Sequence, residues 1–173
     1  MTDQLGYRGR IAIVVPSTNT SCQPECEALR PAGVTNHTGR ISIKERPLTT
    51  EQAFMEHVQA MRDGMRTAID QVVTCQPTHV IMGVALEAFW GGVAAAAELQ
   101  AELTARAGIG VSMGSTATVA ALEKFGARRI AVLTPHQPRG DEQVRHYFEE
   151  AGFSIRSEEH TSALQSPYVI SYA

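Results

Sequence analysis

The sequence predicts an α/β fold in which an open parallel sheet carries helices on both faces. Short apolar runs closed by proline or glycine alternate along the chain with longer stretches of helical periodicity. The apolar runs are continuous, as in strands that are buried on both faces of a parallel sheet. About six strands and five helices in strict alternation are typical of this architecture. With 173 residues, 43% of them hydrophobic, the chain can bury a core of this kind.

The first half of the chain begins with a continuous apolar run at residues 11–15, which predicts a buried strand. A polar loop at 17–21 follows, with hydroxyl and amide groups suited to capping a short helix at 22–29 and to binding an anion. Alternating apolar and polar residues predict an edge strand at 40–45. Apolar side chains that recur at steps of three and four predict a long helix from residue 49 to residue 75, with one face on the sheet.

The second half begins with the central strand at residues 79–82, which is bounded by a proline and by Gly83. A turn at 84–90 then leads to an Ala-rich helix at 93–106. The remaining predicted elements are again separated by glycines and capping residues. They are a strand at 108–111, a helix capped by 112–116 that ends near 125, a strand at 129–133, a helix at 141–151 and a strand at 153–155.

Four loops at the carboxyl ends of predicted strands are expected to meet around one crevice, the usual ligand site of such sheets. They are residues 17–20, 83–90, 112–116 and 134–138. These loops are rich in hydroxyls, amides and helix N-termini, and poor in acids and bases. This composition favours a small anionic ligand, a carboxylate or a phosphate.

The strand-end motifs resemble, in order and spacing, the aspartate/glutamate racemase superfamily, in particular its maleate cis-trans isomerase and arylmalonate decarboxylase branch. The likeness covers about residues 8–155. It rests on the runs IAIVVPSTNT, VIMGVALEAFWGG, STATVAALEKFGARRIAVLTPH and QPRGDEQV. The resemblance implies a two-lobe enzyme without cofactor or metal. Such an enzyme binds a small carboxylate through loop N–H and hydroxyl groups and uses one or two cysteines on the adjacent carbon.

Two positions carry most of what the resemblance implies for the site. Asn19 matches the family's substrate-binding asparagine, whereas Gly83 stands where the family places its first catalytic cysteine. The decarboxylase branch also has a glycine there and relies on a cysteine of the second lobe. The catalytic residue is therefore expected beyond this lobe, in a decarboxylase-like rather than a two-cysteine site.

Three further positions depart from the family pattern. Val84 and Ala85 replace the hydroxyl residues with which decarboxylases hold a second carboxylate, so only their backbone N–H groups can donate. His136 replaces a tyrosine, and it is either a substrate contact or a solvated loop residue. Ser17 and Ser115 complete the predicted substrate-binding set.

The last 18 residues differ in character from the rest. Residues 156–173, RSEEHTSALQSPYVISYA, resemble a translated sequencing adapter joined to a truncated gene. We therefore interpret 1–155 as one Rossmann-like or flavodoxin-like lobe and 156–173 as a non-native tail, although an ordinary C-terminal strand and helix is the alternative. Truncation would expose an apolar face that the second lobe covers, which favours a homo-oligomer.

Charge and cysteine usage exclude several other classes. A net charge of −3 provides no basic face for nucleic acid, and no apolar run of about 18 residues exists to cross a membrane. Cys22, Cys26 and Cys75 form no even disulfide framework, which favours the cytoplasm. The C-x3-C spacing also differs from the usual zinc spacing, so we interpret all three as small apolar side chains. Glu87 is either an acid in the site or, as we prefer, the cap of the Ala-rich helix.

Three functional hypotheses follow. In the first, the full-length protein is a cofactor-independent racemase, isomerase or decarboxylase of small carboxylates, whose second lobe supplies the catalytic cysteine. In the second, the chain binds a small carboxylate without catalysis. The third, a nucleotide-binding module, is disfavoured because neither a G-x-G-x-x-G nor a P-loop motif follows a predicted strand.

Overall fold

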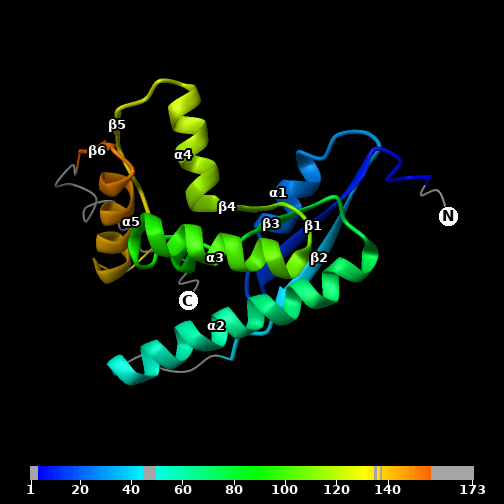
Figure 1. The fold of residues 1–173 in the computed structure, drawn as a ribbon, viewed down its shortest axis with the longest axis horizontal. Helices are drawn as coiled ribbons and strands as arrows, with labels where there is room; N and C mark the ends of the chain where they lie inside the picture. Colours follow the sequence, from blue (N-terminus) through cyan, green and yellow to red (C-terminus); the bar gives the residue numbers. More distant parts are fainter. Residues whose placement is uncertain (1–3, 45–49, 135, 137, 157–173) are drawn as a thin grey trace.

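The computed structural model describes residues 4–44, 50–134, 136 and 138–156, and only the backbone of Glu51 and Phe54. Strands and helices alternate through these residues, as predicted (Figure 1). The strands are β1 (Gly9–Pro16), β2 (Val34–Ile41), β3 (His79–Met82), β4 (Val111–Met113), β5 (Arg129–Ile130) and β6 (Ser154–Ile155). The helices are α1 (Cys22–Ala28), α2 (Glu51–Val72), α3 (Gly92–Ala107), α4 (Gly114–Lys124) and α5 (Pro138–Glu150), with single 3-10 turns η1 (Val73–Cys75) and η2 (Leu86–Ala88).

The first four strands form one parallel sheet in the order β2-β1-β3-β4. Ile11 of β1 is paired with Asn36 on one side and with His79 on the other. The predicted α/β class is confirmed, and β3 is an interior strand while β2 lies at an edge. All four strands end at the same edge of the sheet, which places the loops after β1 and β3 next to each other.

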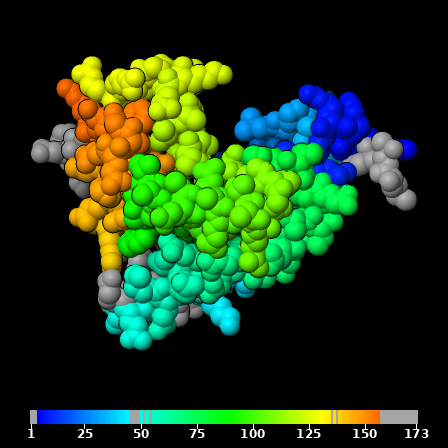
Figure 2. Space-filling view, in the orientation of Figure 1, coloured from blue at the N-terminus to red at the C-terminus, as the bar shows by residue number. Residues whose placement is uncertain are grey.

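The last two strands do not extend this sheet. β5 and β6 pair with each other, Arg129 with Ser154, as a separate two-stranded parallel sheet. Together with α4 and α5 they lie at one end of the molecule (Figure 1). On the face seen in Figure 2, a notch separates α4, in yellow-green, from the blue segment around α1. The expectation of one continuous sheet is therefore wrong, because the loop that follows β5 does not leave a strand of the main sheet.

Several strand boundaries also differ from the predicted ones, and the strand predicted at 129–133 ends at Ile130. Two other differences have a clear physical cause. The edge strand is Val34–Ile41 rather than 40–45, because these largely polar residues pair with β1 along its whole length. The strand predicted at 108–111 begins only at Val111, because Gly108 has a φ of 68° and ends α3 in the left-handed region. In both cases the boundary depends on pairing or on glycine geometry rather than on apolar composition.

The main core lies between the sheet and one layer of helices, α2 and α3, whereas α1 covers the opposite face (Figure 1). The predicted apolar face of α2 is confirmed, since Met65 and Ile69 are fully buried. A Cβ on Gly64 would lie 2.5 Å from the Cγ2 atom of Ile41, so α2 approaches β2 more closely than a side chain permits. The predicted N-terminus also holds, because the Thr50 hydroxyl accepts a hydrogen bond from Ala53 N–H (3.1 Å).

A second core lies between α3 and α5 and is mostly aromatic. The rings of Phe89 and Tyr147 meet edge to face with centroids 5.2 Å apart, and Phe148 packs against both. Phe89 is also packed against the main core. The segment after β3 therefore joins the two cores. No helix in the described part of the chain is long and apolar enough to span a bilayer.

Candidate functional site

Ser17 joins the carboxyl ends of the first two strands. Its backbone N–H donates to the carbonyl oxygen of Ile41 (2.7 Å), and its hydroxyl accepts a hydrogen bond from the N–H of Ile43 (3.0 Å). A hollow of about 310 Å³ adjoins this junction, lined by Ile43, Lys44, His57 and three further residues. Ser17 thus belongs to the carboxyl edge of the sheet, as predicted from the sequence, and uses its hydroxyl oxygen to hold the loop after β2.

Asn19 is the residue around which the loop after β1 is built. Its Oδ1 atom accepts hydrogen bonds from the N–H groups of Ser21 (3.1 Å) and Cys22 (2.9 Å), so its side chain caps α1. Its backbone carbonyl accepts from the Arg40 guanidinium (2.8 Å). The Nδ2 group donates to no residue in the described ranges. Asn19 therefore offers one amide donor at the sheet edge, while its oxygen is already engaged.

Gly83 occupies a position where no side chain fits. Its N–H donates to the carbonyl oxygen of Val14 (2.7 Å). A Cβ atom would lie 2.6 Å from the Cγ1 atom of Val15 and 2.7 Å from the Sγ atom of Cys22. A cysteine at residue 83 would therefore require both neighbours to move. The glycine predicted to mark a one-cysteine site is here dictated by packing as well.

The two residues after Gly83 turn in opposite directions. The Val84 side chain is buried in the main core, whereas Ala85 is exposed and precedes η2. Neither backbone N–H donates a hydrogen bond to another residue that the structure describes. Two N–H donors at the end of β3 and the Asn19 amide at the end of β1 therefore lie on neighbouring strand ends, where a carboxylate can accept from both.

Ser115 is placed differently from the other predicted residues. It is fully buried at the start of α4. Its hydroxyl lies beside that of Tyr147, without a hydrogen bond of ordinary geometry to any described group. Burial raises the pKa of Tyr147, and the Ser115 hydroxyl partly opposes that effect. Ser115 therefore has no exposed surface with which to meet a ligand in this structure.

His136 lies close to the turn after β3 although its own strand belongs to the second sheet. Its N–H donates to the Thr134 hydroxyl (3.2 Å), which in turn contacts the carboxylate of Asp141. Next to it, the Cα atom of Gly140 is so close to both His136 and Leu86 that a Cβ would lie 2.7 Å and 3.3 Å from them. Half-buried His136 thus lies near Leu86 of the turn after β3.

The preferred role for Glu87, as cap of the Ala-rich helix, is wrong. The N–H of Val93 donates to the Glu150 carboxylate (2.8 Å), and that of Gly91 donates to Gln143 (3.2 Å). Both caps come from α5, more than 50 residues further along the chain. Because no local motif encodes such a contact, the sequence contained no signal for it.

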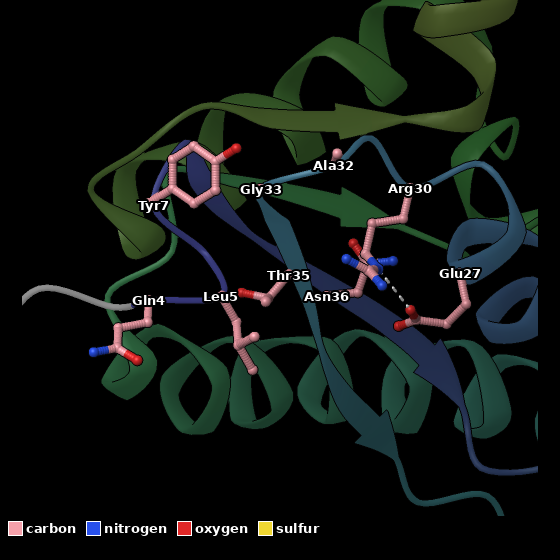
Figure 3. Close-up of a pocket in the computed structure, with 9 residues that line it drawn as sticks. All are labelled: Gln4, Leu5, Tyr7, Glu27, Arg30, Ala32, Gly33, Thr35 and Asn36. Carbon is pink, nitrogen blue, oxygen red and sulfur yellow. Dashed lines mark hydrogen bonds and ion pairs between the residues drawn. The ribbon is translucent and has the colours of Figure 1, made fainter.

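Another hollow, of about 490 Å³, lies at the opposite edge of the sheet, beside the amino ends of β1 and β2 (Figure 3). Its ion pair and its asparagine already have partners within the chain. Arg30 pairs with Glu27 (3.1 Å) and donates to the carbonyl of Val34 (2.6 Å), and Asn36 donates to the carbonyl of Cys26 (3.1 Å). We therefore place the candidate site at the carboxyl edge. Nowhere in the described ranges do three or more His, Cys, Asp or Glu side chains form a group suited to a metal.

Solved structures with the same fold include two maleate isomerases and a decarboxylase. The Pseudomonas putida S16 maleate isomerase with bound maleate has a TM-score of 0.74 and 19% identity, over 86% of this chain and 61% of the isomerase. A variant Nocardia farcinica maleate cis-trans isomerase with a covalently bound succinylcysteine intermediate has a TM-score of 0.71 and 21% identity, over 85% and 62% of the two chains. Arylmalonate decarboxylase itself has a TM-score of 0.62 and 18% identity, over 84% and 59%. The chain therefore spans about three fifths of the length of these proteins.

The sequence comparison identifies the family directly. A search of curated proteins gives no match. The family model described as arylmalonate decarboxylase, however, matches residues 11–166, which is most of the chain and includes the loops after β1, β3 and β4. The chain therefore belongs to the arylmalonate decarboxylase family.

Proposed function

We propose that the full-length protein is a cofactor-independent enzyme that isomerises, racemises or decarboxylates small carboxylates. The observation that carries this proposal is the edge where β1 and β3 end. There, the Asn19 amide and the N–H groups of Val84 and Ala85 are donors without a partner among the described residues, beside Gly83. Neutral and backbone donors on neighbouring strand ends suit a carboxylate oxygen. Family membership and the fold support the reaction class.

A second lobe with a catalytic cysteine is part of the proposal. The chain spans 61% of the maleate isomerase with the same fold. Phe125, at the end of α4, and Leu133, in the loop after β5, are 87% and 78% exposed. Such exposure is unusual for large apolar side chains and suits a surface that packs on further protein. The same exposure favours self-association of the chain in isolation. The assignment of 156–173 as a non-native tail remains our proposal, because 157–173 lie outside the described residues.

Two features bear on the kind of reaction. The crowding at Gly83 favours a one-cysteine site of the decarboxylase type, because a cysteine there would collide with Val15 and Cys22. Val84 and Ala85 present no hydroxyl for a second carboxylate, which disfavours a malonate. The hollow beside Ser17 is lined by Lys44 and His57. It offers a cationic ammonium group and an imidazole ring for a second carboxylate of a longer substrate. The odd number of cysteines supports a reducing compartment, the cytoplasm.

The alternative function is carboxylate binding without catalysis by the chain as it stands, since no thiol extends from the end of β3 itself. Both functions are tested by titrating the ¹⁵N-labelled chain with maleate and with phenylmalonate, with phosphate as the control anion. We expect amide shifts at residues 17–22 and 83–85 with a carboxylate and smaller ones with phosphate. If a folded chain shows no shifts there with either carboxylate, the site is refuted.

Turnover is measured in the same samples by ¹H NMR, as fumarate from maleate and as phenylacetate from phenylmalonate. The source DNA is resequenced across codon 155, and any longer product is assayed alongside the 173-residue chain. We expect binding by both proteins and turnover only by the longer one. If the longer protein binds both carboxylates and converts neither, nor racemises a chiral carboxylate, the enzymatic proposal falls and the binding function remains.

A further inference from the structure

β2 is an edge strand of the main sheet, and its outer edge has no partner in the part of the chain that the structure describes. The carbonyl oxygen of Ile41 accepts a hydrogen bond from Ser17, which follows β1. Because the backbone groups of successive strand residues point to opposite sides, Ile41 and the other odd-numbered residues of β2 bond to β1 and the even-numbered ones face outward. The N–H and C=O groups of three such residues have no partner among the described residues: Asn36, Thr38 and Arg40.

The strand lacks the features with which native sheets protect an edge. β2 has eight residues, contains no proline and pairs with β1 in one unbroken register, so no bulge turns it away. The opposite edge strand, β4, has only three residues. α1 and α2 pack on the two faces of β2 and do not bond to its outer edge. An edge of this kind is a template for another strand.

A hollow lies at each end of this edge. The hollow of about 490 Å³ is lined by Gly33 and Asn36 at the amino end of β2 (Figure 3). Its lining includes Glu27, whose Oε2 atom pairs with Arg30 (3.1 Å) while Oε1 has no partner among the described residues. Lys44 lines the hollow of about 310 Å³ that follows the strand, and its ammonium group has no described partner. One end of the edge therefore offers a carboxylate oxygen and the other end an ammonium group.

We propose that β2 is a homodimer interface, where the β2 strand of a second copy adds antiparallel and joins two four-stranded sheets into one. A two-fold axis at Thr38 uses all three outward residues, because Asn36 then pairs with Arg40 of the second copy and Thr38 with its own counterpart. No like charges face each other in this register, and threonine pairs are favourable across strands. The inference goes beyond the proposed function and does not depend on it.

Charge at the two ends favours a second copy over an unrelated strand. In the same register Lys44 of the second copy lies opposite Ala32, which lines the same hollow as Glu27. The two-fold axis repeats this pairing of opposite charges at the other end of the interface. In the monomer the Lys44 ammonium group remains available to the hollow beside Ser17. The edge thus complements itself in backbone groups and in charge.

Sedimentation velocity of the 173-residue chain over a range of concentrations tests the interface. We expect a dimer that dissociates on dilution. Thr38→Lys is expected to raise the dissociation constant about tenfold or more, because two ammonium groups then face each other across the axis. Thr67→Lys, at an exposed position of α2, is the matched control with an unchanged constant. Lys44→Glu and Glu27→Lys are each expected to raise the constant severalfold, and the double variant is expected to restore it.

Amide hydrogen exchange gives an independent measurement, residue by residue. In the dimer the three outward amides of β2 are expected to be protected, and dilution should remove this protection while the inward amides stay protected by β1. A chain that is monomeric at every concentration overturns the inference, as does a dimer whose dissociation constant is the same in Thr38→Lys as in the parent. If Leu133→Ser abolishes association and Thr38→Lys does not weaken it, the exposed surface around Leu133 is the interface instead, and the inference is likewise overturned.

Discussion

Asn19 has two separable tasks, and two substitutions of the same residue distinguish them. Its Oδ1 atom caps α1, and its Nδ2 group is the donor that we propose for the ligand. Asn19→Ala removes both functions. Asn19→Asp keeps an oxygen in the capping position, removes the donor and adds a negative charge beside the ligand. The pair therefore separates stability from binding.

The expected magnitudes follow from these contacts. Loss of the cap in Asn19→Ala costs about 1 kcal/mol of unfolding free energy, or about 2–4 °C in Tm for a chain of this size. Asn19→Asp is expected to stay within about 0.5 kcal/mol of the parent, because aspartate is as good a cap as asparagine. A lost hydrogen bond to a charged ligand is worth about 1.5–3 kcal/mol, so both variants are expected to bind a carboxylate about ten- to a hundredfold more weakly.

Urea denaturation gives the stability, and the NMR titration with maleate and phenylmalonate gives the affinity. Full stability in Asn19→Ala would contradict the capping geometry. Parent-like affinity in Asn19→Asp would show that the amide does not face the ligand and would remove the loop after β1 from the site. If Asn19→Asp loses as much stability as Asn19→Ala, the side-chain oxygen of residue 19 is not what stabilises α1.

Three further predictions concern packing, capping and pH. Gly83→Cys is expected to lower the unfolding free energy, measured in urea, by about 1–3 kcal/mol, because the new side chain overpacks against Val15 and Cys22. The double variant Gly83→Cys/Cys22→Ala should recover part of this loss. If it recovers none, the close approach of Cys22 to Gly83 is contradicted. Glu150→Ala is expected to lower the unfolding free energy by about 1 kcal/mol in the same assay, because the cap of α3 is lost. Glu149→Ala, at the exposed neighbouring position, is the control and should lower it little. Equal losses in the two variants would argue against the cap. The raised pKa of the Cys22 thiol, about 11, stabilises the folded state below about pH 9. This stabilisation should disappear as the pH rises from 9 to 11, and it is measured as the urea midpoint at each pH. If Cys22→Ser gives the same pH profile as the parent, the Cys22 thiol is not the cause of the pH dependence.

The fold was largely predictable because its signals are local. The apolar run before Pro16 and the spacing along α2 each identify an element without reference to its neighbours. β2 was misplaced because a strand that includes Thr35 and His37 is recognisable only from its partner β1. The separate β5–β6 sheet was also not predicted. These strands pack with the aromatic side chains of α5 in the second core, and the local sequence does not show that α5 belongs to that core.

The candidate site was predictable to the extent that it follows strand ends. Asn19 and Gly83 were expected at the carboxyl edge and lie there. The cap by Glu150 and the approach of the Cys22 sulfur to Gly83 were not predicted, because each joins residues more than 50 positions apart. Ser115 follows a strand as predicted, yet α5 packs over it, and only the folded arrangement of α4 and α5 reveals that.

The ring of Phe89 has a mechanical consequence for the site. It is packed into both cores at once, six residues after Gly83 on the same short segment. An adjustment of this segment around a ligand would strain two independent sets of packed side chains, so the donors after β3 are held in a preset shape. We therefore expect the proposed site to select ligands that already match the spacing of its donors. The two cores are expected to lose their structure together as one cooperative unit.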